Sequence, residues 1–132
     1  MTYLLDANTC IQFLNGRSEN VRRRLESERP EDIVLCSVVK AELLYGAFKS
    51  ARPTENLDRL LFFFRRFISL PFDDRATEVY GNLRARLERA GTLIGPNDLF
   101  IAAIALSQDV TLVTNNTREF SRVAGLRLED WE

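Results

Sequence analysis

Short apolar runs that alternate with amphipathic segments constrain the fold of this chain more than any other feature of its sequence. Four runs of strand length occupy residues 2–6, 32–37, 68–72 and 110–114, and residues 126–131 are a candidate for a short final strand. Helical spacing and capping residues favour helices over residues 18–28, 38–50, 54–67, 73–91 and 98–105. Apolar strands separated by helices predict an α/β fold, a three-layer sandwich with a central parallel sheet of four to five strands and helices on both faces.

Length and composition favour one globular domain spanning residues 1–132. Hydrophobic residues make up 45% of the 132 residues and charged residues 28%, which is ordinary for such a domain. No apolar run approaches the roughly 20 residues that cross a bilayer, so we expect no membrane association. The opening sequence MTYLLDANT has no basic region ahead of its apolar residues, unlike a secretory signal peptide. We therefore expect a cytoplasmic protein.

The absence of histidine narrows the chemistry. The chain has no His and only two cysteines, Cys10 and Cys36. This excludes a Ser-His-Asp triad, a His-based acid–base pair and a His-bound zinc ion, and two cysteines cannot complete a structural zinc site. Any catalysis must depend on carboxylates, alone or with a hard metal ion that prefers oxygen ligands. The two cysteines are expected to be buried thiols rather than a disulfide.

Four carboxylates occupy matching places beside predicted strands. Asp6 lies at the end of the first strand, and Glu119 follows the fourth. Glu42 and Asp98 lie near the starts of helices. Parallel sheets place their sites at the carboxyl ends of strands, so we expect all four at one edge. Their neighbours are mostly apolar, and carboxylates that converge without local cations favour an Mg²⁺ or Mn²⁺ site. Polar side chains expected beside that site are Asn8, Thr9, Ser37, Thr114 and Asn116.

Asp98 also has a simpler explanation. Asp is favoured in the first turn of a helix, where free N–H groups and the helix dipole stabilise its charge. For an isolated Asp we would prefer this role. Carboxylates in matching places on three other segments favour a functional role instead, because such convergence arises by chance much more rarely than one capped helix.

Four stretches carry a resemblance to a known family. They are LLDANTCI at residues 4–11, SVVKAELLYGA at 37–47, GTLIGPNDLFIAAIA at 91–105 and TLVTNNTREFSRVAGLRLEDW at 111–131. The sequence resembles the PIN-domain ribonucleases, and most closely the VapC toxins of bacterial VapBC toxin–antitoxin modules. Its last stretch is similar to the branch that cuts initiator tRNA in the anticodon loop. Two positions depart from the pattern: Ala7 stands where Thr is more usual, and Asn116 stands where some PIN domains have an acidic residue, which leaves that role to Glu119 and the number of metal ions open.

The resemblance implies a PIN-like sandwich and a metal-dependent endoribonuclease that inhibits translation by hydrolysing RNA, with tRNA as the expected substrate. It implies Mg²⁺ or Mn²⁺ held directly by Asp6 and Asp98, with Glu42 and Glu119 completing the shell directly or through water. Glu42 is expected to orient or deprotonate the attacking water, and the product to carry a 5′-phosphate and a 3′-hydroxyl. The implied partners are a VapB-type antitoxin and a second copy of the chain, within a larger toxin–antitoxin assembly.

Three alternatives stay open at this point. A haloacid-dehalogenase-like phosphatase also begins with Asp after its first strand, but it needs a second Asp where this chain has Asn8. A non-catalytic PIN-like module would bind RNA or protein without cleaving, and is expected to have lost an acidic position. In the third alternative, the four carboxylates are only helix caps and surface charges, which predicts that they lie far apart in space.

Two further sets of residues are predicted to contact macromolecules. All but two of the 18 basic residues are Arg, which binds phosphate bidentately and stacks on bases. Most of these Arg side chains are expected to lie on solvated helix faces. Those expected near the strand ends, and therefore near RNA phosphates, are Arg17, Arg84, Arg86 and Arg118.

The segment RLLFFFRRF at residues 59–67 has too many apolar residues for one helix face. If Leu60, Phe63, Phe64 and Phe67 face the core, the neighbouring apolar residues point elsewhere. The helix is then either buried on two sides or part of an apolar groove for an antitoxin helix, whose chain continues to place a basic side chain among the carboxylates. The predicted groove residues are Tyr45, Phe48, Leu61 and Phe62, flanked by Arg65 and Arg66.

Overall fold

The computed structural model describes all 132 residues and contains one five-stranded parallel sheet. Its strands are β1 (Tyr3–Leu5), β2 (Ile33–Cys36), β3 (Ile68–Leu70), β4 (Thr111–Val113) and β5 (Leu128–Glu129). They lie in the order β3-β2-β1-β4-β5, and every neighbouring pair is parallel. The predicted α/β class and parallel sheet are therefore confirmed.

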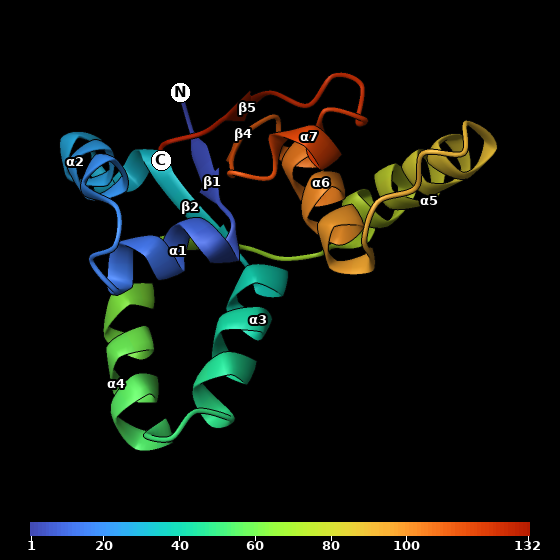
Figure 1. The fold of residues 1–132 in the computed structure, drawn as a ribbon. Helices are drawn as coiled ribbons and strands as arrows, with labels where there is room; N and C mark the ends of the chain where they lie inside the picture. Colours follow the sequence, from blue (N-terminus) through green and yellow to red (C-terminus); the bar gives the residue numbers. More distant parts are fainter.

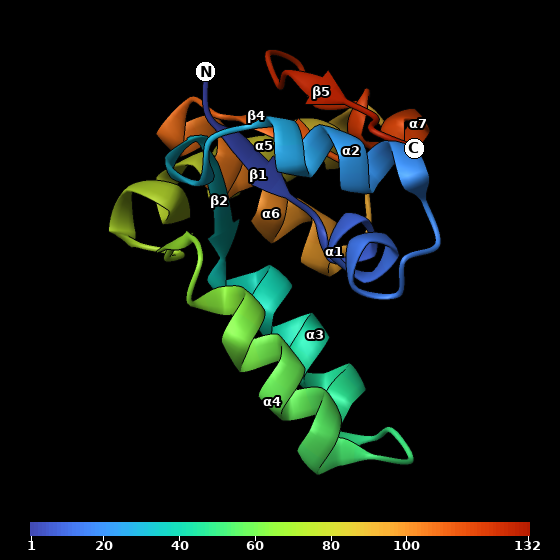
Figure 2. The same cartoon turned by 90° about the vertical axis from the view of Figure 1, so that its left-hand side faces the viewer.

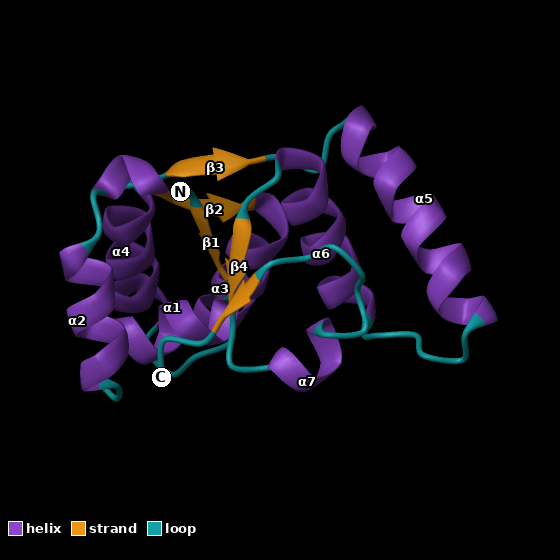
Figure 3. Ribbon diagram, turned by 90° about the horizontal axis from the view of Figure 1, so that it is seen from above, coloured by secondary structure: helices purple, strands orange, loops and turns teal.

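Helices cover both sides of the sheet. They are α1 (Ala7–Leu14), α2 (Glu19–Ser27), α3 (Ser37–Phe48), α4 (Pro53–Phe64), α5 (Asp74–Arg89), α6 (Pro96–Gln108) and α7 (Thr117–Phe120), with a 3₁₀ turn at Pro30–Asp32. Figure 3 shows the strands between α2 and α4 on one side and α5 and α6 on the other. This is the expected three-layer arrangement. Nothing in the sequence pattern led us to expect α1 and α7, which are both short.

Local capping explains where several helices begin. The Oγ of Ser18 accepts a hydrogen bond from the Val21 amide, and Oδ1 of Asp73 accepts one from the Ala76 amide. Asp6 does the same for α1, because its Oδ1 accepts from the Thr9 amide at 2.8 Å. Each of these side chains satisfies an amide that the helix leaves free. Helix α6 begins differently, because its N-cap is Gly95 and Asp98 lies in its first turn.

The core is built around the central strands, and side chains of α2, α3, α4, α5 and α6 contribute to it. Leu4, Leu5, Leu35 and Leu112 are fully buried in the central strands. On α6, buried side chains occur around most of the helix, as the sequence predicted: Leu99, Ile101, Ala102, Ala103, Ile104, Ala105 and Ser107. Cys10 and Cys36 are buried free thiols, which confirms the expectation for them. No helix has the length and hydropathy needed to cross a membrane.

The strand order creates a crevice beside β1. From β1 the chain moves outward through β2 to β3, and it then returns to the other side of β1 as β4. This change of direction is a topological switch point, where ligands bind at the carboxyl ends of strands. Asp6 directly follows β1, and its backbone N–H donates to the Val113 carbonyl at the end of β4. The fold therefore places Asp6 at the expected ligand site.

Helices α3 and α4 form a hairpin that extends away from the sheet (Figures 1 and 2). Leu60, Phe63, Phe64 and Phe67 are buried, as predicted. Phe62 is 70% exposed, and Leu61 is also exposed. The hairpin therefore keeps one apolar face in the core and presents apolar side chains to solvent on another.

Candidate active site

A cavity of about 170 Å³ lies at the carboxyl edge of the sheet. Its lining comes from the β1–α1 junction, α3, α6, the loop after β4, and α7: Asp6, Ala7, Asn8, Glu42, Asp98, Ile101, Asn115, Asn116 and Phe120. Three of the four predicted carboxylates thus meet in one polar cavity. The alternative that they are scattered caps and surface charges is wrong for these three.

Asp6 is held rigidly at the base of this site. It is 8% exposed, and the Thr9 amide fixes its Oδ1. Thr9 is itself tied to β4, because its Oγ1 donates to the Val113 carbonyl at 3.3 Å. The other oxygen of Asp6 accepts no hydrogen bond within the protein. One well-oriented carboxylate oxygen is therefore free for a ligand.

Asp98 and Glu42 carry charge that the protein does not neutralise. Burial raises the pKa of Asp98 to about 6, and the negative charges of Glu119, Glu42 and Asp6 add to this rise. Burial also raises the pKa of Glu42, and the charge of Asp6 contributes. No Lys or Arg forms an ion pair with any of these carboxylates. The cavity therefore favours a bound cation or proton.

Glu119 differs from the other three carboxylates. Its Oε1 accepts a hydrogen bond from the Gly95 amide at 2.6 Å, and its Oε2 accepts one from Asn116 Nδ2 at 3.0 Å. These two bonds are the main reasons that the pKa of Glu119 is lowered. Glu119 contacts Asp98, but it is not among the residues that line the cavity. The structure thus joins Glu119 to the site through the loop before α6.

The polar residues predicted beside the carboxylates take different places. Asn8 and Asn116 line the cavity. Thr114 is buried, and its Oγ1 accepts from the Asn116 amide at 3.0 Å, which orients that residue. Ser37 is exposed as the first residue of α3 and does not line the cavity. Two residues were not predicted: Asn115 lines the cavity and Gly95 binds Glu119.

The donor set of the cavity fits a hard divalent cation. Asp6, Glu42 and Asp98 supply the carboxylate oxygens that Mg²⁺ and Mn²⁺ prefer. No three acidic or cysteine side chains stand close enough to form a complete set of ligands by themselves. Mg²⁺ usually keeps several waters and uses only one or two carboxylates, and the cavity is several times the ~30 Å³ that one water occupies. The residues present therefore suit a partly hydrated ion.

The predicted RNA-binding arginines lie outside this cavity. Arg17, Arg86 and Arg118 are exposed and form no ion pair. Arg84 lies on α5, where it donates to Glu88 and to the Tyr80 hydroxyl, both at 3.0 Å. Three of the four guanidinium groups are thus available to an external anion.

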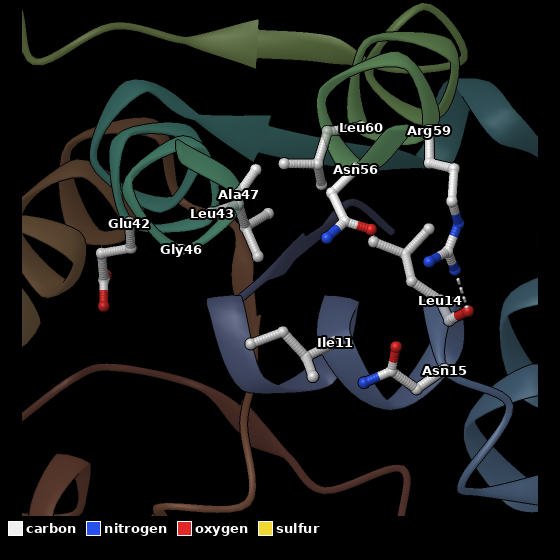
Figure 4. A pocket seen from close by; sticks show the side chains of 10 residues that line it. All are labelled: Ile11, Leu14, Asn15, Glu42, Leu43, Gly46, Ala47, Asn56, Arg59 and Leu60. Carbon is white, nitrogen blue, oxygen red and sulfur yellow. Dashed lines mark hydrogen bonds between the residues drawn. The ribbon is translucent and has the colours of Figure 1, made fainter. Parts of the chain in front are cut away.

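A second, more apolar cavity of about 270 Å³ separates α1 from the α3–α4 hairpin (Figure 4). Arg59 closes one end by donating to the Leu14 carbonyl at 2.6 Å, and Glu42 stands at the other end. Its remaining lining is Ile11, Leu14, Asn15, Leu43, Gly46, Ala47, Asn56 and Leu60. We refer to these residues as the α1–α3–α4 groove.

The predicted groove residues lie outside the α1–α3–α4 groove. Tyr45, Phe48, Leu61 and Phe62 are all exposed on the hairpin. Tyr45 borders a cavity of about 400 Å³ that it shares with Glu42, and Phe62 borders one of about 240 Å³ that it shares with Arg59. The exposed apolar side chains therefore flank the groove without forming its walls.

Sequence comparisons agree with this geometry. A PIN-domain family model matches residues 3–126. Ribonuclease VapC2 of Rickettsia felis is 40% identical over 133 residues, which cover 100% of this chain and 99% of the relative. The tRNA(fMet)-specific endonuclease VapC of Salmonella typhimurium is 40% identical over 131 residues, which cover 99% of this chain and 98% of the relative.

Solved structures give the same result. The chain superposes with a TM-score of 0.94 and 39% identity on a chain of DNA-bound VapBC from Salmonella typhimurium, covering 100% of this chain and 99% of that one. VapBC2 from Rickettsia felis, bound to a DNA fragment from its promoter, gives a TM-score of 0.93 and 39% identity, with 100% of both chains covered. The chain therefore belongs to the PIN-domain family and, within it, to the VapC ribonucleases.

Proposed function

We propose that this chain is a single PIN domain over residues 1–132 that acts as a metal-dependent endoribonuclease, the toxin of a toxin–antitoxin module. The observation that carries the proposal is the cavity lined by Asp6, Glu42 and Asp98 at the switch point of the sheet. Membership of the VapC family supports the ribonuclease activity and argues against a haloacid-dehalogenase-like phosphatase.

Mg²⁺ or Mn²⁺ is the proposed cofactor, held by Asp6 and Asp98, with Glu42 completing the set directly or through water. When bound, the ion supplies charge that activates water and stabilises the transition state at the phosphate. Thr9 fixes one oxygen of Asp6 and leaves the other for this role. Glu42 orients the attacking water and accepts its proton at a carboxylate oxygen. The water oxygen bonds to phosphorus as the P–O3′ bond breaks, and O3′ takes up a proton from solvent, which leaves a 5′-phosphate and a 3′-hydroxyl.

The proposed substrate is tRNA, because the Salmonella typhimurium relative is named as a tRNA(fMet)-specific endonuclease. Cleavage in the anticodon loop of initiator tRNA would inhibit translation, and we place this activity in the cytoplasm. Arg17, Arg86 and Arg118 are exposed and free of ion pairs, so we assign phosphate contacts to them, together with Arg84. Substituting all four should weaken RNA binding and reduce its dependence on salt.

The proposed protein partner is a VapB-type antitoxin. The solved relatives are VapBC complexes, and the α1–α3–α4 groove offers an apolar surface for an amphipathic helix. Tyr45, Phe48, Leu61 and Phe62 would contact the same segment beside the groove. Because Glu42 stands at the end of the groove, the antitoxin chain would continue into the acidic cavity with a basic side chain. We further propose that two copies of this chain pair within the assembly.

End-group analysis of cleaved tRNA tests the reaction. Purified protein, free of antitoxin, is incubated with initiator tRNA and Mg²⁺, and the fragments are tested for ligation and phosphatase sensitivity. We expect a 5′-phosphate and a 3′-hydroxyl, and no cleavage with EDTA or by Asp98→Asn. Asp58→Asn is the matched control, because Asp58 is exposed on α4 and lines neither the acidic cavity nor the α1–α3–α4 groove. A 2′,3′-cyclic phosphate would refute the mechanism, and tRNA binding without cleavage would favour the non-catalytic alternative.

A further inference from the structure

Both oxygens of Glu119 are occupied by donors of the protein. Oε1 accepts from the Gly95 amide at 2.6 Å and Oε2 from Asn116 at 3.0 Å. A bond of 2.6 Å from an amide to a carboxylate is short and charge-assisted. Asn116 is fixed in turn, since its own amide donates to Thr114 Oγ1 at 3.0 Å. Glu119 is thus held in place from two sides, unlike Asp6, which has one oxygen free.

The Gly95 amide is the group that Asp98 would otherwise bind. Gly95 is the N-cap residue of α6, so Asp98 is the third residue of the helix. In a capping box, the side chain at this third position reaches back to the N-cap amide. Here Glu119 takes that amide from a segment 24 residues away. Asp98 is therefore released from the capping role and lines the acidic cavity instead.

The surroundings of Gly95 show that Glu119 and Asp98 both lie close to this residue. A Cβ at position 95 would lie 3.6 Å from Glu119 Oε1 and 3.8 Å from Asp98 Oδ2, which is ordinary contact distance. Both carboxylates therefore border the same face of Gly95. The backbone angles of Gly95, φ −57° and ψ 152°, suit alanine and proline as well as glycine.

We propose that Glu119 is a positioning residue, which acts by occupying the Gly95 amide so that Asp98 stays free to bind a cation, and that it is not itself a metal ligand. The proposal rests on the proposed function only in taking Asp98 as a metal-binding residue. It replaces the expectation from the sequence that Glu119 completes the metal shell. The bond from Gly95 to Glu119 is predicted to persist when metal binds.

The first test observes that bond without any enzymatic assay. In ¹H–¹⁵N NMR spectra of the ¹⁵N-labelled protein, a short bond to a carboxylate shifts the Gly95 amide proton downfield. We expect this shift in the wild type and in Asp98→Asn, and its loss in the combined Asp98→Asn/Glu119→Ala variant, in which no carboxylate is left to accept from the amide. Titration with Mg²⁺ should leave it downfield. A return upfield on adding Mg²⁺ would mean that Glu119 leaves Gly95 for the ion, and the proposal would be wrong.

The second test separates a positioning residue from a ligand by conservative substitution. Glu119→Gln keeps an oxygen for Gly95, and Asn116 can present its own oxygen to the new amide group by turning over. We expect Glu119→Gln to retain most of the Mn²⁺ affinity measured by calorimetry. Glu119→Ala should lose about 10- to 100-fold in Mn²⁺ affinity and in kcat, with the KM for tRNA little changed. Equal losses in both variants would contradict the proposal.

The third test removes the amide itself. Gly95→Pro lacks the N–H donor, whereas Gly95→Ala retains it and serves as the matched variant. We expect Gly95→Pro, which leaves Asp98 no amide to bind, and Gly95→Ala to retain most of the Mn²⁺ affinity. The combined Gly95→Pro/Glu119→Ala variant should regain the affinity that Glu119→Ala loses, whereas Gly95→Ala/Glu119→Ala should stay weak. Equal losses in the two combined variants would contradict the proposal. If the wild type binds Mn²⁺ but cleaves no RNA, the proposed function fails while this cycle still tests the role of Glu119.

Discussion

The acidic cavity and the α3–α4 hairpin both contain side chains that the isolated chain leaves without partners, but for different physical reasons. In the cavity, burial and the negative charge of neighbouring carboxylates raise the pKa of Glu42 and of Asp98. On the hairpin, side chains such as Phe62 leave apolar surface in water. A small cation would neutralise the charge in the cavity, and a protein surface would cover the apolar side chains of the hairpin. The comparison predicts that chemistry and partner recognition depend on two different regions that meet at Glu42, so variants away from Glu42, at Asp6 and at Phe62, should separate the two properties.

The largest expected effect concerns the cavity. Asp6→Asn keeps an oxygen that can accept from the Thr9 amide, so α1 should stay capped, but it removes the charge that faces the cavity. Loss of several kcal/mol of electrostatic stabilisation corresponds to a fall in kcat of about three orders of magnitude. The measurement is single-turnover cleavage of tRNA, with thermal unfolding to verify the fold. Cleavage within tenfold of the wild type would remove Asp6 from the metal site.

The next effect concerns the buried face of the hairpin. Phe63 is 2% exposed and packs against the rings of Phe13, Phe64 and Phe67. Phe63→Ala should lower the free energy of unfolding by about 3–5 kcal/mol, measured by urea denaturation. Phe62→Ala should change it by less than about 0.5 kcal/mol, as is usual for an exposed position. Equal losses would mean that the two faces of α4 are not distinct.

A smaller effect separates recognition from chemistry. Phe62→Ser removes an exposed aromatic beside the α1–α3–α4 groove. Truncating such a side chain at an interface costs about 1–2 kcal/mol, so antitoxin affinity measured by calorimetry should fall about 10-fold while tRNA cleavage is retained. Unfolding of Phe62→Ser, or unchanged antitoxin affinity, would place Phe62 in the core or on an unrelated surface.

The smallest effect is a pH dependence of stability. The pKa of Asp98 is about 6 in the folded chain, above its ordinary value. The folded state therefore binds the extra proton below pH 6, and this contribution to stability is lost as the pH rises through that value. The effect is small because Asp98 is only half-buried and solvent screens its charge.

Comparison with Asp98→Asn isolates the contribution that ionisation of Asp98 makes to stability, because the other carboxylates are common to both proteins. At pH 7.5 and without metal, Asp98→Asn should have a Tm higher than the wild type by about 3 °C, and the difference should shrink towards pH 5. Differential scanning calorimetry at the two pH values measures it. An Asp98→Asn variant that is less stable at pH 7.5 would show that Asp98 is a structural residue.

Most of the sheet and much of the site could be predicted because they depend on local pattern and chain order. Asp6 follows the first apolar run, and the helix that begins near Asp98 leads into the fourth. In a parallel sheet both positions fall at the carboxyl edge, whatever the conformation of the loops. The role of Glu119 could not be predicted, since its bond to Gly95 depends on how two loops 24 residues apart approach each other. The sequence did contain one indication of this bond. Gly95 and Pro96 stand at the start of the Asp98 helix, and because neither has a side chain that caps a helix, a capping group has to come from elsewhere.

The lining of the α1–α3–α4 groove was also beyond the sequence. Helix α1 supplies one wall of it, and with only 8 residues this helix is too short for helical spacing to identify. Ile11 and Leu14 therefore could not be set against Leu60 of α4. Exposed residues such as Phe62 were easier to identify, because the excess of apolar residues on one helix is visible in the sequence alone.

Glu42 borders both the acidic cavity and the α1–α3–α4 groove. A ligand in either place changes the position or the charge of the same carboxylate, so the two occupancies are thermodynamically linked. Linkage is reciprocal: if a partner in the groove lowers the affinity for Mg²⁺, then Mg²⁺ lowers the affinity for that partner by the same factor. If the proposed ion and antitoxin both bind, a higher concentration of free Mg²⁺ would favour the active molecule over the inhibited one through this one side chain.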